Sequence, residues 1–295
     1  MLSVPLALVT ATHSSGHAAA SAVSAPAPTY LIIRADDGGM SHSVNMALER
    51  LMQAGMPLSV SVMFACPWYQ ETAEILKRHP EVAVGVHLTL NSEWKNYRWG
   101  PVSGRSAVPT LVDEEGYFFA TSEALHQHQP DIREVERELR AQIDRARRTG
   151  LKIDYLDYHM GTVSRYPEFR EVAERLAHEY GLGMSQYFEE TRGNPQYEAA
   201  PPDKPDSLVA LVNRLRPGVN LVVTHVGIDN EELGALLDMN TDGGLAEMSK
   251  NRQGELDAVT SRRFREAVSA RGIRLINYRQ LIEMQGLQSM RRPGG

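Results

Sequence analysis

A chain of 295 residues, 42% hydrophobic and 23% charged, has the composition of an ordinary soluble globular protein and is long enough for one large domain or two small ones. Its formal net charge of −6 at pH 7 gives no reason to expect a nucleic-acid-binding surface, which is normally basic. Cys66 is the only cysteine, so a framework of internal disulfides is excluded.

The first 29 residues differ from the rest, since they contain no Lys, Arg, Asp or Glu and are rich in Ala and Ser. Residues 2–11 have about the length of a signal-peptide apolar region, and the small residues that follow offer cleavage sites, but a basic start is missing. We interpret residues 1–29 as a leader, either a signal peptide or a disordered segment. The protein is exported to the periplasm in the first case and cytoplasmic in the second. No later stretch approaches the ~18 apolar residues of a membrane span.

From residue 30 to residue 295, short apolar runs alternate with amphipathic helical patterns. This alternation predicts a parallel sheet with helical crossovers, and about seven units fit a single α/β domain, a (β/α) TIM-like barrel. An open doubly wound sheet is the alternative, although residues 35–43 lack the glycine spacing of a dinucleotide-binding turn. The predicted strands cover residues 30–35, 58–65, 82–90, 153–158, 183–188, 220–225 and 273–278, and the predicted helices cover residues 43–54, 69–77, 131–150, 167–180, 206–215 and 256–271.

Asp and His residues stand at or near the ends of four predicted strands. In a parallel barrel the carboxyl ends of the strands form the active-site face, so we expect these side chains to meet there. A lone histidine in an apolar run is more often a core residue, and Asp37 could instead cap the helix that follows it. The coincidence at several strands favours a metal site, because one Asp and two His would leave an open position on an ion such as Zn²⁺. The residues are Asp36, Asp37, His87, Asp157, His159 and His225.

The segments around these residues resemble the signature segments of the YdjC-like carbohydrate deacetylases, which include chitooligosaccharide and hopanoid-biosynthesis-associated deacetylases. The segments are ADDGGMSHSVNMAL, GVHLTL, DYLDYH and VVTHVG, and the resemblance covers residues 30–282. It implies a distorted TIM-like barrel, a divalent metal, removal of N-acetyl groups from amino sugars and, as in several relatives, a homodimer.

The resemblance also implies a role for each motif residue. Asp37, His87 and His159 fall on the metal ligands, with Zn²⁺ the expected ion and Mg²⁺ the alternative. Asp36 takes the position of the general base, and His225 takes the position of the acid that serves the leaving group.

Three positions depart from the family pattern. Gly38 stands where the family often has Phe, and Val226 stands where Pro-Gly usually follows the histidine. Met160 begins a stretch that lacks the further histidines often found after the D-x-H motif. The metal ligands survive these changes, whereas the substrate pocket is expected to differ.

Two adjacent aspartates need a bend in the backbone if both are to face one site, because successive residues of a strand point to opposite sides. Gly38 and Gly39 make a turn directly after the pair plausible. Asp157 is a candidate to orient a metal ligand or the general base. The alternative interpretation is a strand-end carboxylate that hydrogen-bonds to backbone.

The segment 94–120 is predicted to be a long loop, a kind of segment that is often functional. Trp94, Tyr97 and Trp99 lie at its start and are predicted to bind the apolar faces of sugars, or else to pack as a lid core or a dimer contact. Glu93 and Arg98 are candidate partners for sugar hydroxyls.

Together these features predict a metal-dependent hydrolase that removes N-acetyl groups from amino-sugar-containing carbohydrates by attack of a metal-bound water. The expected partner is a small carbohydrate, with no nucleic acid and no membrane span. Another barrel metallohydrolase, an amidohydrolase or a phosphoesterase, is one alternative, but such enzymes often begin with H-x-H where this chain has Asp36 and Asp37. A non-catalytic sugar-binding relative is the other, and it would need neither Asp36 nor His225.

Overall fold

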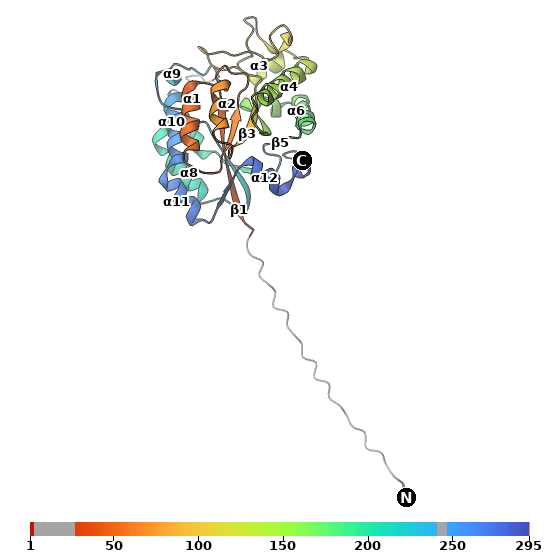
Figure 1. Cartoon of the computed structure of the whole chain (residues 1–295), viewed down its shortest axis with the longest axis vertical. Helices are drawn as coiled ribbons and strands as arrows, with labels where there is room; N and C mark the ends of the chain where they lie inside the picture. Colours follow the sequence, from red (N-terminus) through yellow and green to blue (C-terminus); the bar gives the residue numbers. More distant parts are fainter. Residues whose placement is uncertain (3–26, 241–246, 295) are drawn as a thin grey trace.

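The computed structural model describes residues 1–2, 27–240 and 247–294 (Figure 1). Most of the predicted leader, residues 3–26, lies outside the described residues, so its assignment stays a prediction.

A parallel sheet forms the centre of the molecule, and its longest strand, β1 (Thr29–Gly38), is the hub (Figure 1). β1 pairs with β7 (Gly218–Thr224) along one edge, and with β2 (Ser59–Val62) and β8 (Arg274–Ile276) along the other. The strand order is β5-β4-β3-β2-β1-β7-β6, with β8 beside β1. This curled half-barrel confirms the predicted α/β class and distorted barrel. The remaining strands are β3 (Ala83–Leu88), β4 (Ile153–Tyr158), β5 (Gly183–Met184) and β6 (Thr191–Arg192).

Helices surround the sheet, with α1, α2, α8, α10 and α11 on one flank and α4 and α6 on the other (Figure 1). The helices are α1 (His42–Met52), α2 (Tyr69–Lys77), α3 (Ser122–Gln127), α4 (Ile132–Arg148), α5 (Thr162–Arg165), α6 (Pro167–Tyr180), α7 (Pro195–Glu198), α8 (Lys204–Val212), α9 (Glu231–Gly234), α10 (Met248–Thr260), α11 (Arg262–Ala270) and α12 (Tyr278–Gln285). Short 3₁₀ turns are η1 (Pro109–Leu111), η2 (His159–Gly161), η3 (Pro201–Asp203) and η4 (Leu287–Ser289).

Each predicted element overlaps an element of the structure, but several differ. The strand predicted over residues 183–188 is only the two-residue β5, and Gln186, with φ 69°, lies outside strand geometry. Helix α12 was not predicted.

The single helix predicted over residues 256–271 is two helices, α10 and α11, because Ser261 is extended (φ −61°, ψ 146°) and its side chain caps α11 by accepting a hydrogen bond from Phe264 N. The two-residue strand β6 was not predicted, since it is too short to show an alternating pattern. The predicted long loop contains η1 and an isolated bridge between Val112 and Phe118.

The interior of the half-barrel has an apolar floor beneath a polar layer. Side chains two residues apart in a strand share a face, so buried Ile32 of β1 is followed inward by Arg34 and Asp36, and Tyr155 of β4 is followed by Asp157. The apolar cluster of the floor contains Ile32, Ala83, Tyr155, Phe188, Leu221, Val223, Ile276, Tyr278 and Leu281. Polar groups therefore gather at the carboxyl ends of the strands, above a closed core.

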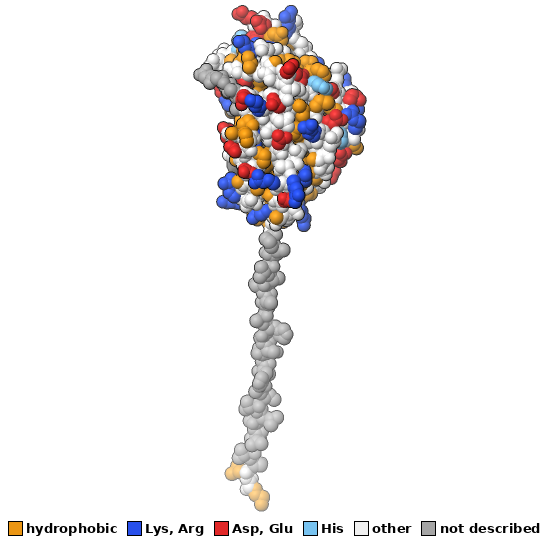
Figure 2. Space-filling view, turned by 90° about the vertical axis from the view of Figure 1, so that its left-hand side faces the viewer, with side chains coloured by type: hydrophobic (Ala, Val, Ile, Leu, Met, Phe, Trp, Pro, Cys, Tyr) orange, Lys and Arg blue, Asp and Glu red, His pale blue; other side chains and the backbone are white. Residues whose placement is uncertain are grey.

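The outer surface gives no sign of a large single-sign charge patch on the face that Figure 2 shows, where Lys and Arg are interspersed with Asp and Glu. Among the described helices, none combines the length and the apolar character needed to cross a bilayer.

Gly85 of β3 leaves space for the ring of Tyr155, and we expect a larger residue at this position to destabilise the fold. A Cβ at Gly85 would stand 2.4 Å from Cζ of Tyr155, whose ring is buried and whose hydroxyl is hydrogen-bonded to Ser61 at 2.8 Å. We predict that Gly85→Ala lowers the free energy of unfolding by about 1–3 kcal/mol, the usual cost of overpacking. Gly234→Ala is the control, because a Cβ there would meet no described atom within 4 Å. Equal stability of the two variants in denaturant titrations would contradict the prediction.

Candidate active site

A β-bulge turns Asp36 and Asp37 toward the same pocket. Ala35 pairs with Val60 and Gly38 pairs with Val62. Two residues of β1, Asp36 and Asp37, therefore lie opposite a single residue of β2. Asp37 itself has φ 63°, in the left-handed region that side chains rarely adopt. The predicted bend therefore exists and begins at Asp37. The predicted turn at the glycines follows it, since Gly39 has φ 86° and Met40 N donates to the Asp37 carbonyl at 3.0 Å.

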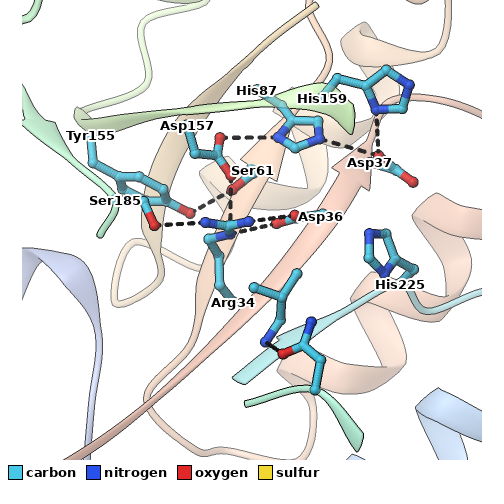
Figure 3. A network of polar contacts seen from close by, with 12 residues as sticks. Arg34, Asp36, Asp37, Ser61, His87, Tyr155, Asp157, His159, Ser185 and His225 are labelled. Carbon is cyan, nitrogen blue, oxygen red and sulfur yellow. Dashed lines mark hydrogen bonds and ion pairs between the residues drawn. The ribbon is translucent and has the colours of Figure 1, made fainter. Parts of the chain in front are cut away.

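Asp37, His87 and His159 converge on one point (Figure 3). Asp37 Oδ1 lies 3.4 Å from His87 Nε2 and 3.4 Å from His159 Nδ1. The three donor atoms lie within 4.8 Å of one another, and all three side chains are buried. Asp37 Oδ1 has no hydrogen-bond partner among the residues that the structure describes. A buried carboxylate oxygen facing two imidazole nitrogens is a donor set that suits a divalent cation such as Zn²⁺.

The second nitrogen of each histidine is held by a carboxylate. His87 Nδ1 lies 3.0 Å from Asp157 Oδ1, and His159 Nε2 lies 2.9 Å from Glu93 Oε2. Carboxylates in this position fix the tautomer and the orientation of metal-binding histidines. Asp157 thus contacts the histidine of the neighbouring strand rather than His159, two residues away. Glu93, a candidate partner for sugar hydroxyls, contacts His159 and also lines the pocket.

Arg34 holds Asp36 in a bidentate ion pair that sequence reasoning missed. Its Nε donates to Asp36 Oδ1 and its Nη2 to Asp36 Oδ2, both at 2.7 Å, and its Nε also lies 3.0 Å from Asp157 Oδ2. Its Nη1 donates to Ser185 Oγ at 2.6 Å. The available signal was an arginine in an otherwise apolar strand, two residues before an aspartate and therefore on the same face.

The carboxylates of this buried cluster outnumber its guanidinium groups. Its ion-paired members include four carboxylates, which exceed its two guanidinium groups by two charges, and all six side chains are less than 9% exposed. Protonation of His87 and His159 would offset this excess when no cation is bound, and a divalent cation bound by the neutral histidines would offset it in their place. The carboxylates belong to Asp36, Asp37, Glu93 and Asp157, and the guanidinium groups to Arg34 and Arg252.

The pKa values of the histidines reflect the same excess of negative charge. Burial alone would lower the pKa of His87, but Asp157 and Asp36 outweigh burial and raise this pKa to about 10. Burial is likewise outweighed at His159, where Glu93 and Asp37 raise the pKa to about 9. Positive charge is therefore strongly favoured where the two imidazoles and Asp37 meet.

The two aspartates remain ionised in spite of burial. Burial would raise the pKa of Asp36, but the Arg34 guanidinium and His87 hold it below its usual value. Burial opposes ionisation of Asp37 as well, but Arg252 and the nearby imidazoles of His159 and His87 hold that pKa well below its usual range.

His225 enters the pocket from the strand next to Asp36 (Figure 3). Ala35 pairs with Thr224, so Asp36 and His225 follow paired residues of β1 and β7. The backbone N of His225 donates to Glu255 Oε2 at 2.9 Å. Its Nδ1 is buried without a hydrogen-bond partner in the described part of the chain. The ring is thus anchored through its backbone and keeps a free nitrogen.

The predicted aromatic residues are divided between the pocket and the core. The pocket has a volume of about 560 Å³, and Trp94 lines it. Tyr97 and Trp99 are not among the described residues that line it. The hydroxyl of Tyr97 donates to the Met40 carbonyl, and Trp99 Nε1 donates to the Asn91 carbonyl at 2.7 Å. These two rings therefore pack inside the loop, as the packing alternative expected, and offer no surface to a sugar in this pocket.

Arg98 also lies away from the predicted role. Its Nη2 donates to Asp113 Oδ2 at 2.8 Å and to the Phe118 carbonyl, and its guanidinium lies 5.1 Å from the centre of the Tyr117 ring. It ties the loop together and is not among the described residues of the pocket wall.

Two residues that sequence reasoning did not select expose apolar surface in the pocket wall. Tyr197 of α7 is 37% exposed, and Met160, which follows the D-x-H motif, is 40% exposed. The ring of Tyr197 packs edge-on against His225, with centroids 5.5 Å apart. No periodic signal could have found Tyr197, because it lies in a helix of four residues.

Comparison with known proteins gives consistent matches over most of the chain. The sequence model of the family described as "YdjC-like protein" matches residues 30–270. A carbohydrate deacetylase from Geobacillus stearothermophilus is 29% identical over 267 residues, which cover 87% of this chain and 100% of that protein. Another from Thermus thermophilus is 33% identical over 234 residues, covering 72% of this chain and 82% of that protein.

A solved structure shares the fold. The crystal structure of a protein from Enterococcus faecalis V583 superposes with a TM-score of 0.72 at 24% sequence identity and covers 86% of this chain and 99% of that chain. The two chains therefore have the same fold.

Zinc is expected to stabilise the fold through this cluster. We predict that excess Zn²⁺ raises the unfolding temperature of the wild type, since a ligand at 100 times its Kd stabilises the native state by about 2.7 kcal/mol. His159→Ala should abolish most of the shift, because it removes one of three donors. His178→Ala, which changes an exposed histidine of α6, should keep it. An equal zinc-dependent shift in the His159 variant would exclude this cluster as the binding site.

Proposed function

The chain belongs to the YdjC-like protein family, and from this premise we propose that it is a carbohydrate deacetylase, a metal-dependent hydrolase that removes N-acetyl groups from amino sugars. One observation carries the proposal: Asp37, His87 and His159 present three buried donor atoms to one point, with the carboxylate of Asp36 beside them. A deacetylase needs both features, because amide hydrolysis requires an activated water and a group that takes its proton.

The three ligands form the reactive centre. Asp37, His87 and His159 would hold a divalent cation, with Zn²⁺ the first candidate; when bound, it would supply a lower pKa for water and polarisation of the acetyl carbonyl. Asp157 and Glu93 keep the imidazole rings turned toward this point through their contacts with the distal nitrogens. Their supporting role is the same at both histidines.

Asp36 acts as the general base. It is ionised because Arg34 binds both of its oxygens, and an ionised carboxylate can accept the proton that the attacking water loses. Arg34 also fixes the direction of the carboxylate, so the base does not rotate away from the pocket. Burial of the pair excludes bulk water from competing for the proton.

His225 acts in the second step, in which the carbon–nitrogen bond breaks. As the carbon–nitrogen bond breaks, the departing nitrogen needs a proton, and an imidazolium can supply it. His225 borders the pocket next to Asp36, and its Nδ1 makes no other hydrogen bond within the described residues. Water and amide thus give acetic acid and a free amine, with one proton accepted by Asp36 and one donated by His225; the acetic acid then ionises to acetate in solution.

Tyr197 and Met160 bind the sugar ring from two sides. Met160 follows β4 and Tyr197 precedes β7, and these strands lie near opposite ends of the curled sheet. Both side chains are exposed in the same pocket, whose buried wall includes Trp94. A pyranose ring has apolar faces that suit an aromatic ring and a thioether, and the polar tip of Tyr197 remains available to a hydroxyl.

The catalytic proposal is tested by acetate release from a panel of N-acetylated sugars. We predict zinc-dependent release by the wild type that EDTA abolishes. Asp36→Asn should lower the rate by about 10²–10⁴-fold, since a neutral amide cannot accept the proton. Asp257→Asn, an exposed change on α10, is the control and should keep wild-type activity.

Three results would argue against the proposal. An Asp36→Asn enzyme as active as the wild type would remove Asp36 from the reaction. Cleavage of a phosphoester with no acetate release would indicate a different metallohydrolase. Saccharide binding without any turnover would indicate a non-catalytic relative.

The proposed contact between Tyr197 and the sugar ring gives a separate prediction. Tyr197→Ala should raise KM for the best N-acetylated sugar about 10-fold, because loss of one aromatic contact costs roughly 0.5–1.5 kcal/mol beyond the area that it buries, and should change kcat less. Tyr117→Ala, which removes a comparably exposed ring outside the described pocket wall, should leave both constants unchanged. A fall in kcat at constant KM would assign Tyr197 to the chemical step instead.

A further inference from the structure

Helix α10 carries a buried charge into the pocket wall that the proposed mechanism does not use. Arg252 is 4% exposed, and its Nη2 donates to Asp37 Oδ2 at 2.7 Å. Its guanidinium lies 5.8 Å from the centre of the Trp94 ring. Its Nε and Nη1 are buried with no hydrogen-bond partner among residues 27–240 and 247–294. A buried cation with so few partners costs stability, which argues that its contact with Asp37 serves the site.

The two oxygens of Asp37 have different surroundings. Oδ2 accepts the hydrogen bond from Arg252, whereas Oδ1 lies 3.4 Å from both His87 Nε2 and His159 Nδ1. The left-handed backbone of Asp37, with φ 63°, removes the side-chain direction that regular strand geometry would impose. The direction of the carboxylate is therefore set by what its oxygens contact.

We infer that Arg252 is a positioning residue that restricts Asp37 to a one-oxygen ligand and aims Oδ1 at the two histidines. This inference rests on the proposed metal site. Without Arg252, Oδ2 would be buried with no donor, a costly state that the carboxylate escapes by turning. Turning takes Oδ1 away from His87 and His159 and weakens the cation site.

Arg252 has two opposite effects on a cation, and they can be told apart. Its positive charge repels the cation, so removal of charge alone would tighten binding. Its hold on Asp37 favours binding, so loss of position would weaken it. The sign of the change in affinity decides which effect dominates, and our inference requires weaker binding.

The test measures Zn²⁺ affinity of the full-length, ion-free protein by competition with a chromophoric chelator. Arg252→Met should bind Zn²⁺ about 10–100-fold more weakly, as is typical when a partner of a metal ligand is removed. Arg252→Lys should lose less than about tenfold, because an ammonium can still donate to Oδ2. Arg279→Met is the matched control: it breaks an arginine–aspartate pair with Asp154, at 2.9 Å, far from the pocket wall, and should bind as the wild type does.

Each other outcome has a defined meaning. Zn²⁺ binding by Arg252→Met that equals or exceeds that of the wild type overturns the inference while the metal site itself stands. A wild type that binds no Zn²⁺ overturns the metal site and the inference together. If circular dichroism shows Arg252→Met to be unfolded, Arg252→Lys decides, and a loss as large as that of His159→Ala overturns the positioning role.

Discussion

The site depends on buried carboxylates that exceed the neighbouring guanidinium groups by two charges, where the strands of the half-barrel end. Four carboxylates and two guanidinium groups are connected by ion pairs in a region that bulk water scarcely reaches. Buried charges are tolerated only when they are paired or bind a metal. The carboxylates raise the pKa values of His87 and His159, and Asp37 Oδ1, which accepts no hydrogen bond from the described residues, faces these two imidazoles. Both observations indicate the same location for a cation.

The fold supplies the geometry that this charge requires. Alternation along β1 places the side chains of Ile32, Arg34 and Asp36 on one inward face, so that Asp36 lies four residues beyond the apolar floor. The bulge at Asp37 then breaks the alternation at the one place where two neighbouring carboxylates must share a pocket. The regular part of β1 thus positions Arg34 and Asp36, and the bulge turns Asp37 toward the same pocket.

Sequence reasoning predicted the parts of the site that lie at strand ends. Asp36, Asp37, His87, His159 and His225 meet because the carboxyl ends of parallel strands share one edge, and the periodic pattern locates those ends. The order and approximate bounds of the main strands followed from the same pattern. Short elements such as β6 and α7 did not, since two to four residues contain no period to detect.

The contacts between distant side chains could not be predicted in the same way. Arg252 lies 215 positions from Asp37, and Glu93 lies 66 positions from His159, so only the folded chain relates them. Aromatic composition was a poor guide within the long loop, because Trp99 satisfies its polar edge internally and faces the core. Tyr197, in an unremarkable segment, has the exposed ring.

The most direct test of the charge argument is an anomalous difference map at the zinc absorption edge, from crystals grown with one equivalent of Zn²⁺. The account predicts one strong peak in contact with Asp37 Oδ1, His87 Nε2 and His159 Nδ1. A map with no peak there, or with its main peak bound by other residues, would show that the negative charge of this pocket serves some purpose other than holding a metal.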